Sequence, residues 1–312
     1  MSTYYHYNDL SELLGLAPPA LMLDRAYIED NQLQGTGLKT VTIDEEFFIG
    51  HFPDSPILPG VLQVTAMSQT ALLTVLNREN SQESADWQVA EINKVKFRNP
   101  VYPGDRLFIK AEIEKEGEGM YKVNARTIVN DQVACQGEMT IAQNKLSIPP
   151  LSAENFAPEL PAFPEDKAEN SCNVNGLMKL IPHRYPFLLV DKILHMDTEN
   201  GEIVGLKNIT GNEPFFNGQN ARYLPAELHP EIAAQTGCAL AMARADRDKK
   251  IAYFMSIDNA RFHSAVCPGD QLVINIAVNA RARFGKGEGV LKVGDRTVSE
   301  LQIKFAIVDR EE

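Results

Sequence analysis

Two segments of the chain carry residues suited to proton transfer, and they are copies of one repeated pattern. The first reads FFIGHFP and contains His51; its counterpart, which begins at Phe215, reads FFNGQN and has Gln219 in place of the histidine. Further along, Thr65 of the first copy matches Glu231 of the second. Each copy therefore holds one of two acid-base groups. We expect one working site shared between the copies and an inert second site that pairs Gln219 with Thr65.

The residues from Pro59 to about Asn77 are apolar on nearly every side, which predicts a helix enclosed by a sheet. Thr65 and Gln69 lie four residues apart on it, as do Glu231 and Gln235 on the second copy, so each pair shares one helix face. Hydrogen bonds to nearby backbone would explain such polar groups without any catalytic role. A buried carboxylate, however, is expected to have a raised pKa, which suits a general acid.

His51 precedes a helix start at Gly60, where free N–H groups and the helix dipole favour an anion. A lone histidine in a loop is more often structural. A base beside an oxyanion site is nevertheless the arrangement that removes a proton alpha to a thioester carbonyl. In the second copy Pro230 is tolerated only in the first turn of a helix, so we expect that helix to begin later and to shift Glu231.

The remaining histidines show no paired acidic or metal-ligand spacing. His229 is two residues from Glu231 and is expected to point to a different side of the helix. We interpret the others as surface or packing residues: His6, His183, His195 and His263.

The repeat extends along most of the chain and predicts two like domains. Residues 1–145 form the first and residues 176–312 the second, with a proline-rich linker at 146–175. Each copy has one long helix followed by β-rich segments, such as 106–113 and 271–278, that open with Pro-Gly-Asp turns. This order indicates an α+β fold in each half.

Composition excludes several classes of function. The 312 residues are 44% hydrophobic, enough for buried cores, and the net charge of −12 argues against a nucleic-acid partner. The absence of a long apolar stretch and of a signal-peptide pattern predicts residence in the cytoplasm without membrane insertion. Four widely spaced cysteines suggest neither a zinc site nor a disulfide framework, and we expect no metal and no redox cofactor.

These motifs resemble the hotdog-fold 3-hydroxyacyl-[acyl-carrier-protein] dehydratases of bacterial fatty acid synthesis. The resemblance rests on GHFP at residues 50–53, LPGVL at 58–62, IPHRYPFLLVDK at 181–192 and NEPFF at 212–216, and it covers both halves. It implies a double hotdog, in which two tandem domains, each a helix wrapped by an antiparallel sheet, pair back to back as a pseudodimer. In that family each active site combines the histidine of one domain with the acidic residue of the other.

The resemblance implies a role for each matching position. His51 would take the C2 proton and Glu231 would help the 3-hydroxyl leave as water. Gly60 would supply an oxyanion N–H, the carbonyl of Ile57 would hold the histidine ring, and Gln235 would orient the carboxyl group of Glu231. The predicted reaction converts a 3-hydroxyacyl thioester to the trans-2-enoyl thioester.

Two other functions stay open from the sequence. One is a hotdog thioesterase, and the other is a non-catalytic acyl-binding or scaffold protein. The expected partner is an acyl carrier protein, or coenzyme A in its place, and pseudodimers could associate further. Two basic clusters are candidates for binding an acidic carrier: Lys94, Lys96 and Arg98, or Arg244, Arg247, Lys249 and Lys250.

Overall fold

The fold is described from a computed structural model. The described residues are 2–81, 84–148, 160–161, 171–216, 218, 222–244, 250–281 and 283–309. Most of the predicted linker at 146–175, together with Gln219, Arg247 and Lys249, lies outside these residues.

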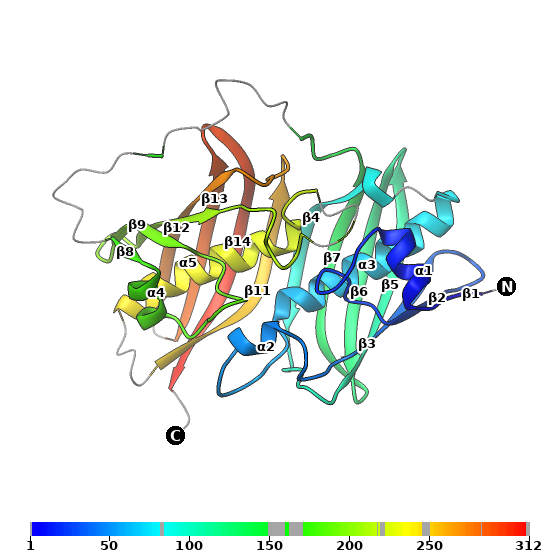
Figure 1. The fold of residues 1–312 in the computed structure, drawn as a ribbon, viewed down its shortest axis with the longest axis horizontal. Coiled ribbons are helices and arrows are strands. Elements are labelled where there is room, and N and C mark those ends of the chain that lie inside the picture. The colour runs from blue at the N-terminus through cyan, green and yellow to red at the C-terminus, as the bar shows by residue number, and fades with distance from the viewer. Residues whose placement is uncertain are drawn as a thin grey trace.

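Within the described residues, fourteen strands form one sheet (Figure 1). From one edge to the other they are β1 (Thr3–Tyr5), β2 (Arg25–Ile28), β3 (Gln34–Thr40), β5 (Arg106–Gly117), β6 (Met120–Val129), β7 (Gln132–Gln143), β4 (Trp87–Phe97), β11 (Lys250–Phe262), β14 (Arg296–Asp309), β13 (Phe284–Val293), β12 (Gln271–Arg281), β10 (Glu202–Asn208), β9 (Lys192–Asp197) and β8 (Cys172–Asn173). Neighbouring strands are antiparallel.

Each half of the sheet packs against one long helix, as the hydrophobic pattern predicted. These are α3 (Gly60–Glu79) and α5 (His229–Arg244), which lie along the same face of the sheet in Figure 1. Most residues of both helices are buried all round, because the curved sheet encloses them. The shorter helices are α1 (Tyr7–Leu14), α2 (Phe47–Gly50) and α4 (Val174–Leu180), with 3₁₀ turns η1 (Ser84–Asp86) and η3 (Ala226–Leu228).

The halves join through β4 and β11, which pair antiparallel at the centre of the sheet. Val95 stands opposite Ile257, and Asn93 opposite Asn259, whose side-chain amide donates to the Asn93 oxygen. The two copies thus meet edge to edge and continue one sheet. The expectation that they pair back to back is wrong, because the free edges of β4 and β11 satisfy their N–H and C=O groups in each other.

One hydrophobic core runs through both halves. It includes Ile92 and Val95 from the first half and Ile257 and Ile274 from the second, all fully buried. An enclosed apolar core shared in this way couples the two halves, since neither can unfold without exposing surface of the other.

We predict a single unfolding transition for the two halves. Ile274→Ala, a core truncation in the second half, should cost about 2–5 kcal/mol. Trp87 is the only tryptophan and lies in the first half, so its fluorescence reports that half. Urea titrations should show the Trp87 midpoint falling together with the far-ultraviolet circular dichroism midpoint. A Trp87 midpoint unaffected by this substitution would show that the halves unfold independently.

Candidate active site

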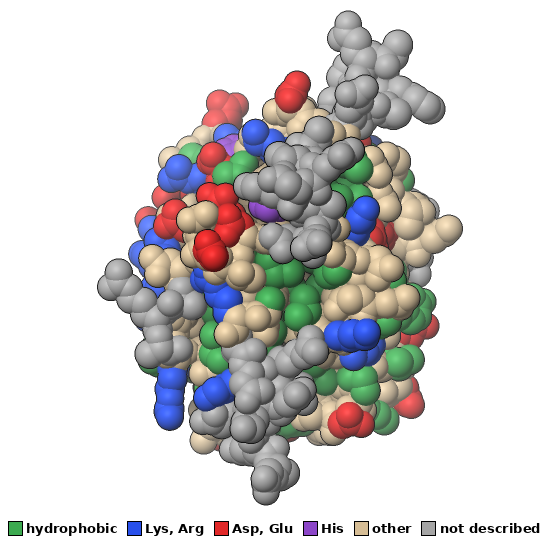
Figure 2. Space-filling view, turned by 90° about the vertical axis from the view of Figure 1, so that its left-hand side faces the viewer, with side chains coloured by type: hydrophobic (Ala, Val, Ile, Leu, Met, Phe, Trp, Pro, Cys, Tyr) green, Lys and Arg blue, Asp and Glu red, His purple; other side chains and the backbone are tan. Residues whose placement is uncertain are grey.

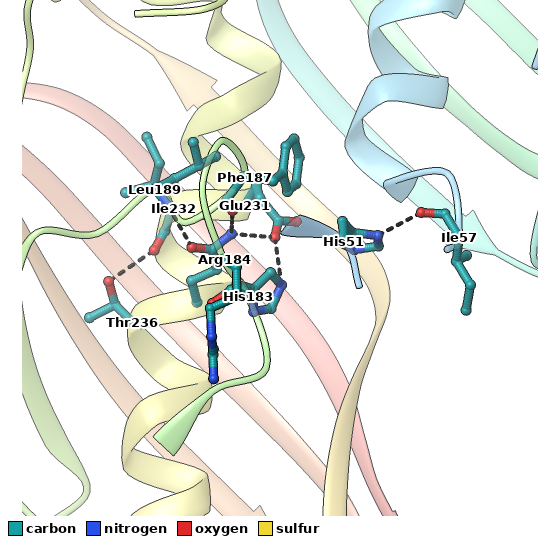
Figure 3. Close-up of polar contacts among 10 residues, drawn as sticks. His51, Ile57, His183, Arg184, Phe187, Leu189, Glu231, Ile232 and Thr236 are labelled. Atoms are coloured by element: carbon teal, nitrogen blue, oxygen red, sulfur yellow. Dashed lines mark hydrogen bonds and ion pairs between the residues drawn. The ribbon is translucent and has the colours of Figure 1, made fainter. Parts of the chain in front are cut away.

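The two halves together enclose a cavity of about 1380 Å³, including its open mouth. His51, Gly60 and Phe97 line it from the first half, and His183 and Glu231 line it from the second. The histidine and the carboxyl group that the sequence divides between the copies therefore face one space, as Figure 3 shows.

His51 ends the short helix α2 and lies in the loop that leads to α3. Its Nδ1 lies 2.7 Å from the carbonyl oxygen of Ile57, and its own carbonyl accepts from the Ile57 N–H at 3.1 Å. A carbonyl can only accept, so Nδ1 carries the proton and Nε2 keeps its lone pair. The ring also stacks on Phe52, with centroids 4.1 Å apart, and meets the edge of Phe187. These contacts fix a neutral imidazole whose free nitrogen can act as a base.

Burial, followed by the positive charge of His183, lowers the pKa of His51 to about 4, although Glu231 and the Ile57 carbonyl oppose the shift. The imidazole is therefore neutral at physiological pH, which is the protonation state that a base requires.

Glu231 lies in the first turn of α5 and is 4% exposed. Gln235, one turn later, donates from Nε2 to Oε1 of Glu231 at 2.9 Å. The same amide also donates to the carbonyl of Phe187 and accepts from the N–H of Leu189. Gln235 thus ties both the helix and the carboxyl group to the 187–189 loop, in the position predicted for an orienting residue.

His183 is the residue that the sequence reasoning missed. It is 8% exposed, and its Nε2 lies 3.5 Å from Oε1 of Glu231. Its ring centroid is 5.6 Å from that of His51, so it stands close to both predicted catalytic groups (Figure 3). The expectation that His183 has no acidic partner is wrong, and it is not a surface residue. A comparison of the two copies could have revealed His183. Its counterpart in the first copy is Leu16, and this difference resembles those at His51 and Glu231.

The expected rise in the pKa of Glu231 is also wrong as a net direction. Burial does raise its pKa, but the hydrogen bond and charge of His183, the charge of His51 and the bond from Gln235 together lower it below the ordinary value. The contributions of His183, His51 and Gln235 together therefore outweigh desolvation, and sequence spacing did not reveal the contact with His183.

A close contact between loops of the two halves brings the groups together. The N–H of Arg184 donates to the carbonyl of Gly50, next to His51, at 3.0 Å. A Cβ on Gly50 would lie 1.9 Å from the carbonyl oxygen of Arg184, so only glycine fits there. The Arg184 guanidinium holds its own loop by donating to the carbonyls of Met178, Ile181 and His183.

Gly60 is the first residue of α3 and lines the cavity beside His51. The first N–H groups of a helix have no partner within it, which suits the predicted oxyanion role. A Cβ here would approach the ring of Phe97 to 2.8 Å. Glycine therefore allows this wall of the cavity to pack closely.

The second helix does begin later, as Pro230 predicted. The turn Ala226–Leu228 is 3₁₀, and α5 starts at His229, because Pro230 has no N–H to bond to the carbonyl four residues before it. The chain path is otherwise kept: Pro59 and Pro225 have matching dihedrals, with φ −53° at both. Glu231 consequently still reaches the cavity.

The predicted inert site is described only in part, because Gln219 lies outside the described residues. The Thr65 hydroxyl donates to the carbonyl of Val61 at 3.1 Å, a bond within its own helix. Gln69 repeats the role of Gln235, donating to the carbonyl of Ala20 and accepting from the N–H of Met22. This half keeps the scaffold of the site without its acid.

The repeat also matches known families. The FabA-like domain, a family model, matches residues 16–138 and 181–302, which is more than half of the chain. The chain belongs to the FabA-like family. Relatives include the 3-hydroxyacyl-[acyl-carrier-protein] dehydratases FabZ of Bacillus thuringiensis (strain Al Hakam) and Bacillus mycoides (strain KBAB4). Each is 41% identical over 143 residues, which are 45% of this chain and 99% of the relative.

Solved structures match over both halves at once. The dehydratase domain of RzxB from Pseudomonas fluorescens covers 91% of this chain and 98% of its own, with a TM-score of 0.60 and 13% identity. The dehydratase domain of PpsC from Mycobacterium tuberculosis, in complex with C12:1-CoA, covers 93% and 99%, with a TM-score of 0.53 and 14% identity. The double-hotdog, α+β fold predicted from the sequence is confirmed.

The pKa of His51 generates a pH prediction. Protonated His51 cannot accept a proton, so the acid limb of the kcat/KM profile should lie near pH 4. Stopped-flow assays after brief pH jumps would measure this profile. In His183→Gln the acid limb should move to higher pH, because a cation that lowers the pKa of His51 is removed. If the acid limb of the wild-type kcat/KM profile lay near pH 6.5, the ordinary pKa of histidine, the buried environment assigned to His51 would be contradicted.

Proposed function

We propose that the chain removes water from 3-hydroxyacyl thioesters at one composite site, with His51 as the base and Glu231 with His183 as the acid. The FabZ relatives confirm the reaction class and make the chain a hydro-lyase of fatty acid or related acyl-chain synthesis, and the dehydratase-domain structures share its fold. The observation that carries the site assignment is the single cavity lined by His51 and Glu231 from opposite halves.

The first step is proton removal from C2 of the substrate. Nε2 of His51 takes the proton, and the electron pair of the C–H bond moves toward the thioester carbonyl. The N–H groups at the start of α3, beginning with Gly60, stabilise the negative charge on that oxygen. The Ile57 carbonyl holds the ring and favours the imidazolium that forms, since it accepts from Nδ1.

The second step is loss of the 3-hydroxyl group. The bond from C3 to oxygen breaks and its electron pair leaves with the oxygen. The pair that moved toward the thioester carbonyl in the first step returns and forms the double bond between C2 and C3. Glu231 and His183, at 3.5 Å, hold one proton between them, and this proton converts the leaving hydroxide to water. His51 has gained one proton and the Glu231–His183 pair has lost one, so return of that proton restores the site.

A thioesterase and a non-catalytic acyl-binding protein were the alternatives. The named relatives are dehydratases, and the acid and base that survive belong to the same cavity. Decay without selection would not preserve complementary members of one pair. Dehydration is therefore the function that the site supports best.

We further propose that the acyl group arrives on an acyl carrier protein that binds near Arg98. Arg98 is exposed, lines the mouth of the catalytic cavity and follows the exposed Lys96 on β4, whereas Lys94 is paired with Glu138. The Arg244 guanidinium instead donates to the carbonyls of Thr198 and Glu199.

At the end of the molecule formed by the second half, the visible basic side chains are scattered among acidic ones (Figure 2).

No helix in the described residues is long and apolar enough to cross a membrane. The domain boundaries, residence in the cytoplasm and further self-association stay predictions.

The composite site is tested by two pairs of substitutions. His51→Ala and Glu231→Gln should each lower kcat by roughly 10²–10⁴-fold, the contribution of one positioned acid or base. Thr65→Ala and Gln219→Ala, the matched changes in the other copy, should leave kcat within about twofold. Hydration of a crotonyl thioester, followed by loss of enoyl absorbance, measures all four. Full activity in either catalytic variant would refute the shared site.

Carrier docking predicts a different kinetic signature. Arg98→Glu should raise KM for a carrier-linked substrate by about tenfold, because a like charge slows association with an acidic partner. KM for the same acyl group on pantetheine should be unchanged. Arg244→Glu, on the other basic cluster, is the matched control. Equal effects on both substrates, or a larger effect from Arg244→Glu, would move the docking site away from Arg98.

A further inference from the structure

A second cavity lies across the interface between the halves. It encloses about 850 Å³, including its mouth, and is mainly apolar. Leu72 on α3 and Trp87 on β4 line it from the first half, and Phe215 and Ala226 from the second. It is therefore composite in the same way as the catalytic cavity.

The two cavities are built from equivalent positions of the repeat. Matching residues of the two copies line both of them: Thr65 with Glu231, Ser68 with Ala234, Gln69 with Gln235, Leu72 with Cys238, and Gly60 with Ala226. The glutamine crosslink between helix and loop is intact at both places. The fold has thus kept a second cavity of the substrate-binding type where the catalytic groups are replaced.

The replacements follow a chemical pattern. Leu16 stands at the position of His183, Thr65 at that of Glu231, and Leu72 at that of Cys238. Each exchange removes an ionisable group and leaves an alkyl or hydroxyl group. A cavity that is lined in this way can hold an alkyl chain but lacks the His183 and Glu231 groups of the catalytic cavity.

The second cavity also holds a polar pair that the catalytic cavity lacks. Glu227, 7% exposed, lies in its wall, and the Ser68 hydroxyl donates to its Oε1. The counterparts of these two residues are Val61 and Ala234, so the active site has no such pair. Burial raises the pKa of Glu227, which favours the protonated acid. A neutral acid can donate its proton to an uncharged carbonyl oxygen of a ligand.

We propose that this cavity is a non-catalytic binding site for an acyl thioester, with the chain against Leu72, Trp87 and Phe215 and an uncharged oxygen at Glu227 and Ser68. The ligand class rests on the proposed function, since it is the class of the substrate and product. Binding of the acyl thioester in the second cavity does not require turnover in the catalytic cavity.

Trp87 provides a direct reporter, because it is the only tryptophan and lines this cavity but not the catalytic one. Decanoyl-pantetheine is a suitable probe, since it has a thioester carbonyl but no 3-hydroxyl to eliminate. Titration of the full chain should shift the Trp87 emission saturably, and calorimetry should give two bound probes per chain. One bound probe with unchanged Trp87 emission would overturn the proposal.

Matched substitutions assign the signal to one cavity. Ser68→Phe should abolish the Trp87 response and reduce the stoichiometry to one, whereas Ala234→Phe, at the equivalent position, should also leave one site but keep the response. If the response were lost in Ala234→Phe and kept in Ser68→Phe, the second site would not exist. Glu227→Gln changes almost no volume and tests the pair without filling the cavity. It should weaken the Trp87-reported affinity by about 2–10-fold, the effect of one net hydrogen bond.

Decanoate tests the nature of the head group. Burial disfavours a charged group, so decanoate should bind the second cavity more weakly than decanoyl-pantetheine. Equal or tighter binding of decanoate would overturn the assignment to an uncharged oxygen. Dehydration of a 3-hydroxyacyl thioester is measured separately. Loss of that activity with an intact Trp87 response would count against the proposed function alone, and the reverse result against the second site alone.

Discussion

Pairing of β4 with β11 is the interaction on which the site depends. It joins two half-sheets edge to edge and sets Val95 opposite Ile257 at the centre. Because α3 and α5 pack on the same face of the continuous sheet, the start of each helix lies close to the loops of the other half (Figure 1). Both composite cavities follow from this single arrangement. Neither half alone can bring His51 to Glu231, so the interface builds the proposed active site as well as part of the core.

Tandem duplication explains why the two cavities could diverge. In a symmetric dimer every substitution appears in both sites at once, whereas in a single chain each copy changes alone. His51, His183 and Glu231 converge on one cavity, while Leu16 and Thr65 stand at the positions of the last two in the other. Positions needed for folding have stayed paired, as in the buried ion pairs Lys39–Glu45 and Lys207–Glu213, which occupy equivalent places in the two copies. The two copies therefore differ chiefly at the residues proposed to transfer protons.

The sequence predicted the repeat, the enclosed helices, the shared site and the double-hotdog class, because these follow from local pattern and from long motifs. It did not predict what depends on contacts between distant segments. His183 lacks an acidic neighbour in the sequence, yet the 181–187 loop carries it to Glu231. The pKa of Glu231 then falls instead of rising, since the sign is set by that contact. Glu227 was overlooked for the same reason, because its partner Ser68 lies in the other copy.

The electrostatics of the catalytic cavity suit a reaction in which a proton leaves one carbon and another arrives at the neighbouring oxygen. A base must be neutral before the step, and burial ensures this for His51. An acid must hold a proton at the same pH, and a carboxyl group whose pKa is lowered does not do so alone. In the mechanism that we propose, the adjacent imidazole of His183, 3.5 Å from Glu231, resolves this conflict by acting with the carboxyl group as one acid. The proposed site therefore uses three ionisable groups, and the third, His183, comes from the same half as the carboxyl group.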